Sequence, residues 1–156
     1  MTLDPIAPTL APDSEASLEL GLNPIEIIEA VISGLDQSGN PLVNHSDDSS
    51  IWKFTYGSAT VFVQLTGIGA DSTITTWSPV LNLPVANPPG LYEKLLELNW
   101  LTTLEARFAI FEHQVMILTS RTLAEIGPGE IARGITIVAN LADDYDDALQ
   151  AEFPAA

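Results

Sequence analysis

The chain of 156 residues contains no cysteine, and it has only five lysine and arginine residues against 21 aspartate and glutamate residues. The absence of cysteine excludes disulfide bonds, thiolate nucleophiles and cysteine-ligated metals, and it fits a reducing compartment. A formal net charge of −16 repels phosphate backbones and anionic lipid surfaces. We therefore expect no nucleic-acid and no membrane partner. The charge favours a basic or apolar protein partner, or it serves only to keep the protein dispersed.

Targeting and membrane-spanning segments are also missing from the sequence. The N-terminus has no basic region followed by an apolar run, as a secretory signal peptide would have. No apolar stretch reaches the ~18 residues that a membrane helix requires. The expected location is the cytoplasm.

The negative charge is concentrated at the two ends of the chain. Residues 1–20 contain four acids, three prolines and no base, and residues 143–156 contain five further acids and no base. Because residues 1–20 show no sustained hydrophobic period, we predict a flexible acidic tail there. Residues 21–153 are long enough for a single α+β domain. The acidic ends serve either solubility or the choice of partner.

Two hydrophobic periods alternate along the rest of the chain. Apolar residues at steps of three and four, each run introduced by a proline, predict helices, and alternation with a period of two predicts strands joined by short turns. Short connections require antiparallel pairing. The predicted elements are a helix over 24–35, strands over 52–56, 60–65 and 72–81, a helix over 88–99, strands over 106–110 and 115–119, and a last helix from about Gly127 to Leu149.

This order, α-β-β-β-α-β-β-α, predicts the α+β fold class, with an antiparallel sheet and helices packed on it. Pro79 falls within the third predicted strand and lacks the N–H group of a regular strand position. It is therefore expected at an edge or a bulge of the sheet.

No catalytic or cofactor motif is complete. Gly67-Ile68-Gly69 is followed by a strand and not by a helix, so it indicates a turn and not a dinucleotide site. Gly127-Pro128-Gly129 opens a helix but lacks the lysine of a phosphate-binding loop. His45 and His113 fall in predicted loops, outside any metal-ligand spacing, and should be solvated. We predict a protein that is not an enzyme and has no cofactor or metal.

The acidic residues leave one alternative open, a small enzyme or metal-dependent regulator with an unrecognised carboxylate site. The run Asp143-Asp144-Tyr145-Asp146-Asp147 lacks the alternation, glycine and closing glutamate of a hand-type calcium loop. On a helix its aspartates should flank Tyr145 and face water, although acids at this end oppose the helix dipole. Glu105 with Glu112 is a possible acid-base pair, and both are expected to be exposed.

One stretch resembles a known family. Leu95-Leu96-Glu97-Leu98-Asn99 and the strand Glu105-Ala106-Arg107-Phe108-Ala109-Ile110 resemble the Leu-Leu-x-x-Asn helix end and following strand of the YbjN family. That family is similar in structure to the class I type III secretion chaperones, and the likeness covers about residues 21–152. It implies the same fold, a small acidic homodimer, and chaperone or adaptor activity toward a protein partner. The resemblance implies no catalytic residue.

Aromatic residues of the predicted meander are the candidates for the partner surface. Trp52, Phe62 and Trp77 would anchor an interface if the sheet leaves them on an open face. The alternative is that all three belong to the core, as most large apolar residues do. The sequence predicts a protein-binding, chaperone-like or adaptor homodimer.

Overall fold

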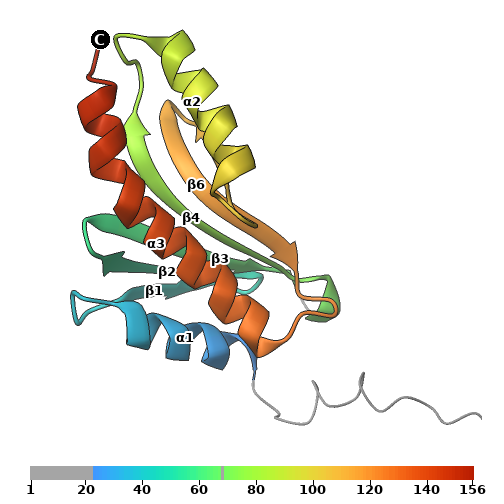
Figure 1. Cartoon of the computed structure of the whole chain (residues 1–156). Coiled ribbons are helices and arrows are strands. Elements are labelled where there is room, and N and C mark those ends of the chain that lie inside the picture. Colours follow the sequence, from blue (N-terminus) through green and yellow to red (C-terminus); the bar gives the residue numbers. More distant parts are fainter. Residues whose placement is uncertain (1–22, 68) are drawn as a thin grey trace, which may run out of the picture.

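The structure is a computed structural model that describes residues 23–67 and 69–156. In this part of the chain six antiparallel strands form one sheet, and three helices lie along one of its faces (Figure 1). The predicted tail, residues 1–20, lies outside the described residues. The elements are α1 (Pro24–Leu35), β1 (Leu42–His45), β2 (Ser49–Tyr56), β3 (Ala59–Thr66), the 3-10 turn η1 (Gly69–Asp71), β4 (Thr73–Asn82), α2 (Pro88–Leu101), β5 (Arg107–Phe111), β6 (Gln114–Thr122) and α3 (Pro128–Glu152).

The strands lie in the order β1-β2-β3-β4-β6-β5. The predicted meander is confirmed because β2 pairs with β3 and β3 with β4, and the predicted hairpin is confirmed because β5 pairs with β6. β4 and β6 join the two units into one sheet, which confirms the α+β fold class. Pro79 lies in the central strand β4, where the register shifts between Pro79 and Leu81, so its missing N–H is accommodated by a bulge.

Strand β1 corrects the prediction that residues 37–50 form a loop. It is an edge strand whose four side chains are all exposed, so it carries no hydrophobic alternation that sequence reading could detect. Its pairing with β2 holds it in place. His45, expected to be solvated, lies in this strand, with Nδ1 2.8 Å from Oγ of Ser50 and its ring edge-on to Trp52.

The helices begin as the sequence predicts. The side chain of Asn23 accepts a hydrogen bond from the N–H of Ile25, and Glu26 accepts one from the N–H of Asn23, so both ends of the capping box are made. α3 runs obliquely across the sheet over β4 (Figure 1). Its buried apolar residues follow the predicted seam: Ile131, Ile135, Val138 and Ala142 recur at steps of three and four, and Leu149 lies two turns further on.

The two faces of the sheet have different surroundings. Side chains that point toward the helices make the core together with α1, α2 and α3. The core residues on the strands include Trp52, Phe54, Val61, Val63, Ile74, Val80, Phe108, Val115 and Ile117. Alternate residues point to the opposite face, which no described helix covers (Figure 1). That second face is called the open face below.

Two aspartates of α3 correct the expectation that the acidic run faces water. Asp143 accepts a hydrogen bond of 2.8 Å from the N–H of Ser58, and Ser58 Oγ donates to Asp146 at 2.7 Å. Asp146 is buried. The sequence could not show this because Ser58 lies in the β2–β3 turn, 85 residues from Asp143. These bonds tie the turn to α3.

Gly57→Ala should destabilise the protein more than Gly39→Ala. Both glycines have a positive φ, 56° and 74°, where alanine costs about 1–2 kcal/mol. An added Cβ at Gly57 would lie 2.0 Å from Asp143 Oδ1, whereas at Gly39 no atom lies within 4 Å. Displacing Asp143 also breaks its bond to Ser58, so we expect Gly57→Ala to cost roughly 3 kcal/mol in urea denaturation. Equal costs at the two positions would contradict this account of the turn.

Candidate protein-interaction surfaces

Seven of the nine exposed large hydrophobic residues described lie on α2, on the loop after it and on edge strand β5. Trp100 is 88% exposed, and Leu96 is 70% exposed. Large apolar residues that are exposed in one region of a soluble protein mark an interaction site. We call this set the α2–β5 surface: Tyr92, Leu96, Trp100, Leu101, Leu104, Ile110 and Phe111. Within it, strand alternation turns Ile110 toward the helix side of the sheet and Phe111 toward the opposite side, at the β5 edge.

The local structure of α2 explains the exposure. Leu91 and Leu95 point into the core, while Tyr92, Leu96 and Trp100 recur at steps of four on an adjacent stripe. The apolar face of the helix is therefore wider than the part that packs against the core. The sequence predicted a buried stripe at residues 91, 95 and 98. It did not predict the exposed apolar stripe, although the i, i+4 spacing of residues 92, 96 and 100 could have indicated it.

Asn99 fixes α2 against β5. Its side-chain oxygen accepts a hydrogen bond of 2.7 Å from the N–H of Phe108, and its amide donates to the carbonyl of Phe108 at 3.3 Å. One side chain thus satisfies both backbone groups of a strand residue. This geometry gives a physical role to the Leu-Leu-x-x-Asn helix end: it sets the position of the exposed stripe of α2 relative to the edge strand.

A second candidate surface lies on the open face. Phe62 and Trp77 are register partners on β3 and β4, and their rings stack with centroids 5.3 Å apart and planes 10° apart. Each ring is partly exposed. Lys53 lies beside them on β2, with its ammonium group 5.8 Å from the centroid of Phe62. Phe62 and Trp77 thus stay candidates for contact with a partner.

Trp52 is a correction to the predicted partner surface. It is 2% exposed, it packs on the helix side of the sheet, and its indole N–H lies 3.4 Å from an oxygen of Glu29 on α1. Alternation in β2 turns Trp52 and Phe54 toward the helices and Lys53 toward the open face. The sequence showed this alternation but not which of the two faces the helices cover.

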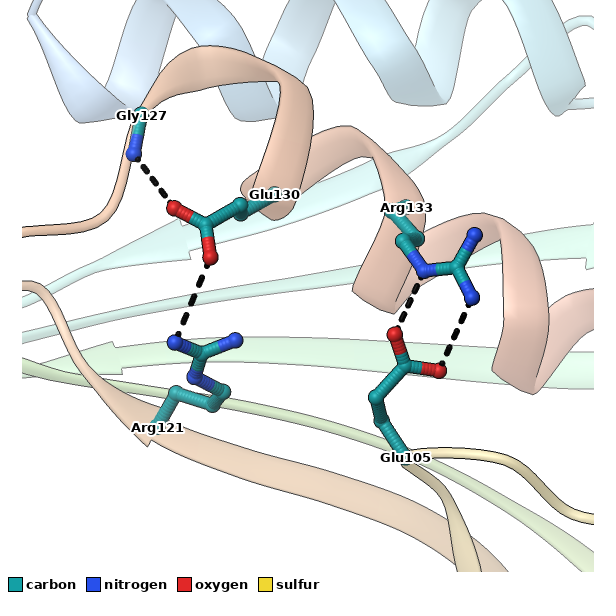
Figure 2. Close-up of polar contacts among 5 residues, drawn as sticks. All are labelled: Glu105, Arg121, Gly127, Glu130 and Arg133. Carbon is teal, nitrogen blue, oxygen red and sulfur yellow. Dashed lines mark hydrogen bonds and ion pairs between the residues drawn. The ribbon is translucent and has the colours of Figure 1, made fainter.

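An arginine–glutamate cluster joins the start of α3 to β6 and to the loop before β5 (Figure 2). Arg133 donates to both oxygens of Glu105, at 2.5 and 3.2 Å. Arg121 lies 3.4 Å from one oxygen of Glu130, whose other oxygen accepts from the N–H of Gly127 at 3.0 Å. The guanidinium group of Arg133 lowers the pKa of Glu105.

This cluster does not have the properties of a catalytic carboxylate site. The cavity between its residues measures only about 60 Å³. A lowered pKa keeps Glu105 charged, the opposite of what a general acid requires. Glu112 follows β5 whereas Glu105 precedes it, so the two are separated by roughly 20 Å of strand. Over residues 23–67 and 69–156, no three histidine or carboxylate groups gather as metal ligands would.

Comparisons with known proteins agree with this description. The sequence matches the family model of YbjN, described as "Putative bacterial sensory transduction regulator", over residues 24–151. A solved structure titled "Crystal Structure of the ExsC-ExsE Complex" is similar in fold, with a TM-score of 0.54 and 13% sequence identity, covering 80% of this chain and 94% of that one. A comparison with curated proteins finds no match. Among the helices described, none combines the length and apolar character of a membrane span.

The pairing of Glu105 with Arg133 makes a prediction about pH. Because the folded-state pKa of Glu105 is lowered, its contribution to stability is present above the unfolded-state pKa and is lost as the pH falls through the folded-state value. Glu105→Gln should therefore lower the thermal midpoint slightly at pH 7, and this decrease should shrink as acidification protonates Glu105 in the folded protein. Glu112→Gln is the matched control, since Glu112 has no ion pair among the described residues. If the decrease in the thermal midpoint caused by Glu105→Gln does not shrink in acid, the charged pair of Glu105 with Arg133 is not its cause.

Proposed function

Because this chain belongs to the YbjN family, we propose that it is a non-enzymatic protein-binding protein, chaperone-like or adaptor in type, that acts as a homodimer in the cytoplasm. The family match, together with a fold like that of a protein solved in a complex, supports a regulatory protein that works by contact with another protein. The α2–β5 surface is the single observation that carries the proposal.

The α2–β5 surface is rich in the aromatic and aliphatic residues that anchor protein interfaces. It combines one tryptophan, one tyrosine, one phenylalanine and four aliphatic residues with the exposed carboxylates of Glu93 and Glu97. Leu101 lies beside the ion pair between Lys94 and Glu152. Aromatic residues are enriched at the centre of interfaces and contribute much of the binding free energy. Homodimers with twofold symmetry bring the same patch of both copies together. A second copy would cover the exposed stripe of α2 and the edge of β5.

Dimerisation through this surface leaves the part of the open face on β3 and β4 for a partner protein. Phe62 and Trp77 offer a stacked aromatic platform on β3 and β4, away from α2. In the ExsC–ExsE structure a protein of this fold is bound in a complex, which supports such a role for the fold. The partner surface and the dimer surface then lie on different parts of the sheet.

Charge on the α2–β5 surface should disrupt the dimer. Leu96→Glu together with Trp100→Glu should raise the dimer dissociation constant by about 30-fold or more, since loss of a hot-spot residue costs about 2 kcal/mol. Leu42→Glu together with Val43→Glu is the matched control, because both residues are exposed on the other edge strand. Sedimentation velocity measures the oligomeric state. A wild-type protein that stays monomeric at tens of micromolar, or a double variant that stays dimeric, would overturn the dimer proposal.

Loss of the aromatic platform should remove the partner and keep the dimer. Phe62→Thr with Trp77→Thr retains residues that suit a strand while removing both rings. Affinity capture from native lysate, quantified by mass spectrometry, should show a protein that co-purifies with the wild-type chain and is lost from this variant. The Leu42→Glu, Val43→Glu variant should capture the same protein as the wild type. If the Phe62→Thr, Trp77→Thr variant captures the same proteins as the wild type, the partner does not bind to these two rings.

A further inference from the structure

The basic residues of this acidic chain are distributed unevenly over the structure. Three of the five are in ion pairs: Lys94 with Glu152, Arg121 with Glu130, and Arg133 with Glu105. The other two, Lys53 and Arg107, form no ion pair with any described residue, and both are exposed. Both lie on the open face.

The strands that form the open face carry no negative charge. None of the six strands contains an aspartate or glutamate. Register places one row of side chains across five adjacent strands, from Lys53 through Phe62, Trp77 and Leu118 to Arg107. Strands are spaced about 4.8 Å apart, so the two cations lie roughly 19 Å apart with an apolar row between them.

A ligand that matches this face carries negative charge and apolar side chains together. Such a segment exists in the chain itself. Residues 1–22 contain four acids and no base, and they also contain apolar residues along their length; the acids are Asp4, Asp13, Glu15 and Glu19, and the aliphatic residues include Leu3, Ile6, Leu10, Leu18 and Leu20. The described acids lie on the helices, turns and loops, where they repel this segment.

We propose that residues 1–22 dock on the open face of the same chain, with their carboxylates near Lys53 and Arg107 and their aliphatic residues on Phe62 and Trp77. The segment joins the domain at Asn23, immediately before α1, and α1 packs over β2 from the helix side. Twenty-two residues span up to about 70 Å when extended, which is enough to pass around the β1 edge and cross a row of roughly 19 Å.

The covalent link favours the chain's own segment over a free acidic peptide. A tethered segment acts at an effective concentration in the millimolar range. A separate acidic partner must instead approach a protein with a net charge of −16. The docking is independent of the proposed dimer. Its consequence for regulation rests on the proposed function: a partner that uses Phe62 and Trp77 must first displace the segment.

The absence of cysteine makes a direct test possible in the full chain. Ser14→Cys introduces one site for a nitroxide spin label into the segment. Paramagnetic broadening in ¹H–¹⁵N spectra then reports which indole N–H groups the label approaches. We expect loss of the Trp77 signal and retention of the Trp100 signal, because Trp77 lies on the open face and Trp100 on the outer side of α2.

Charge reversal on the face should abolish the broadening. Lys53→Glu with Arg107→Glu should restore the Trp77 signal, as should ~1 M salt, where the Debye length falls to about 3 Å. Lys94→Glu with Arg133→Glu changes the net charge equally but lies off the open face, and should leave Trp77 broadened. The spectrum of each variant also shows whether it is folded.

Two results would overturn the proposal. One is an unbroadened Trp77 in the folded, labelled wild-type chain. The other is broadening that appears only when spin-labelled chains at natural isotope abundance are mixed with unlabelled ¹⁵N chains, which would show that the segment of a second copy occupies the face. The Leu96→Glu, Trp100→Glu variant should be monomeric and still show a broadened Trp77 signal. This result would show that the docking does not require the dimer, so that one proposal can fail without the other.

Discussion

The packing of all three helices on one face of a single antiparallel sheet is the constraint on which the rest of the structure depends. α3 covers β4 and β3 along its whole buried seam, and α1 packs against α3 and β2. With this face filled, most of the hydrophobic free energy of folding comes from one side of the sheet. The opposite face and the stripe of α2 beside the β5 edge are then left without a cover from the described chain, and both become candidates for contact with other polypeptides.

Charged residues, like the helices, are distributed unevenly between the two faces of the sheet. The acids of residues 23–67 and 69–156 lie on helices, turns and loops, and the strands contain none. Two bases without an ion pair among these residues lie at the ends of an apolar row on the open face. Acidic residues are rare in strands partly because aspartate and glutamate have low β propensity. The consequence is a face that differs from the rest of an acidic protein. The buried Asp146 and the half-buried Asp143 have a structural role, since they hold the turn at Ser58.

The residues that carry the family likeness act through structure and not through chemistry. Asn99 bonds both backbone groups of Phe108, and the leucines before it divide between the core and the exposed stripe. The arginine–glutamate cluster likewise links α3 to the strands without forming a site of catalytic character (Figure 2). The molecule therefore presents surfaces, and its proposed activity is recognition of protein.

The sequence by itself determined the helices, five of the six strands, the meander, the hairpin and the α+β class, because period and turn chemistry are local properties. The sequence also determined the net charge, and it contains no complete catalytic motif. Only the tertiary structure decided which face of the sheet is covered. Trp52 and Phe62 lie on neighbouring strands with the same alternation, yet one is in the core and the other on the open face. Strand β1, the bonds of Asp143 to Ser58 and the exposure of Trp100 likewise depend on partners distant in sequence, which no local pattern records.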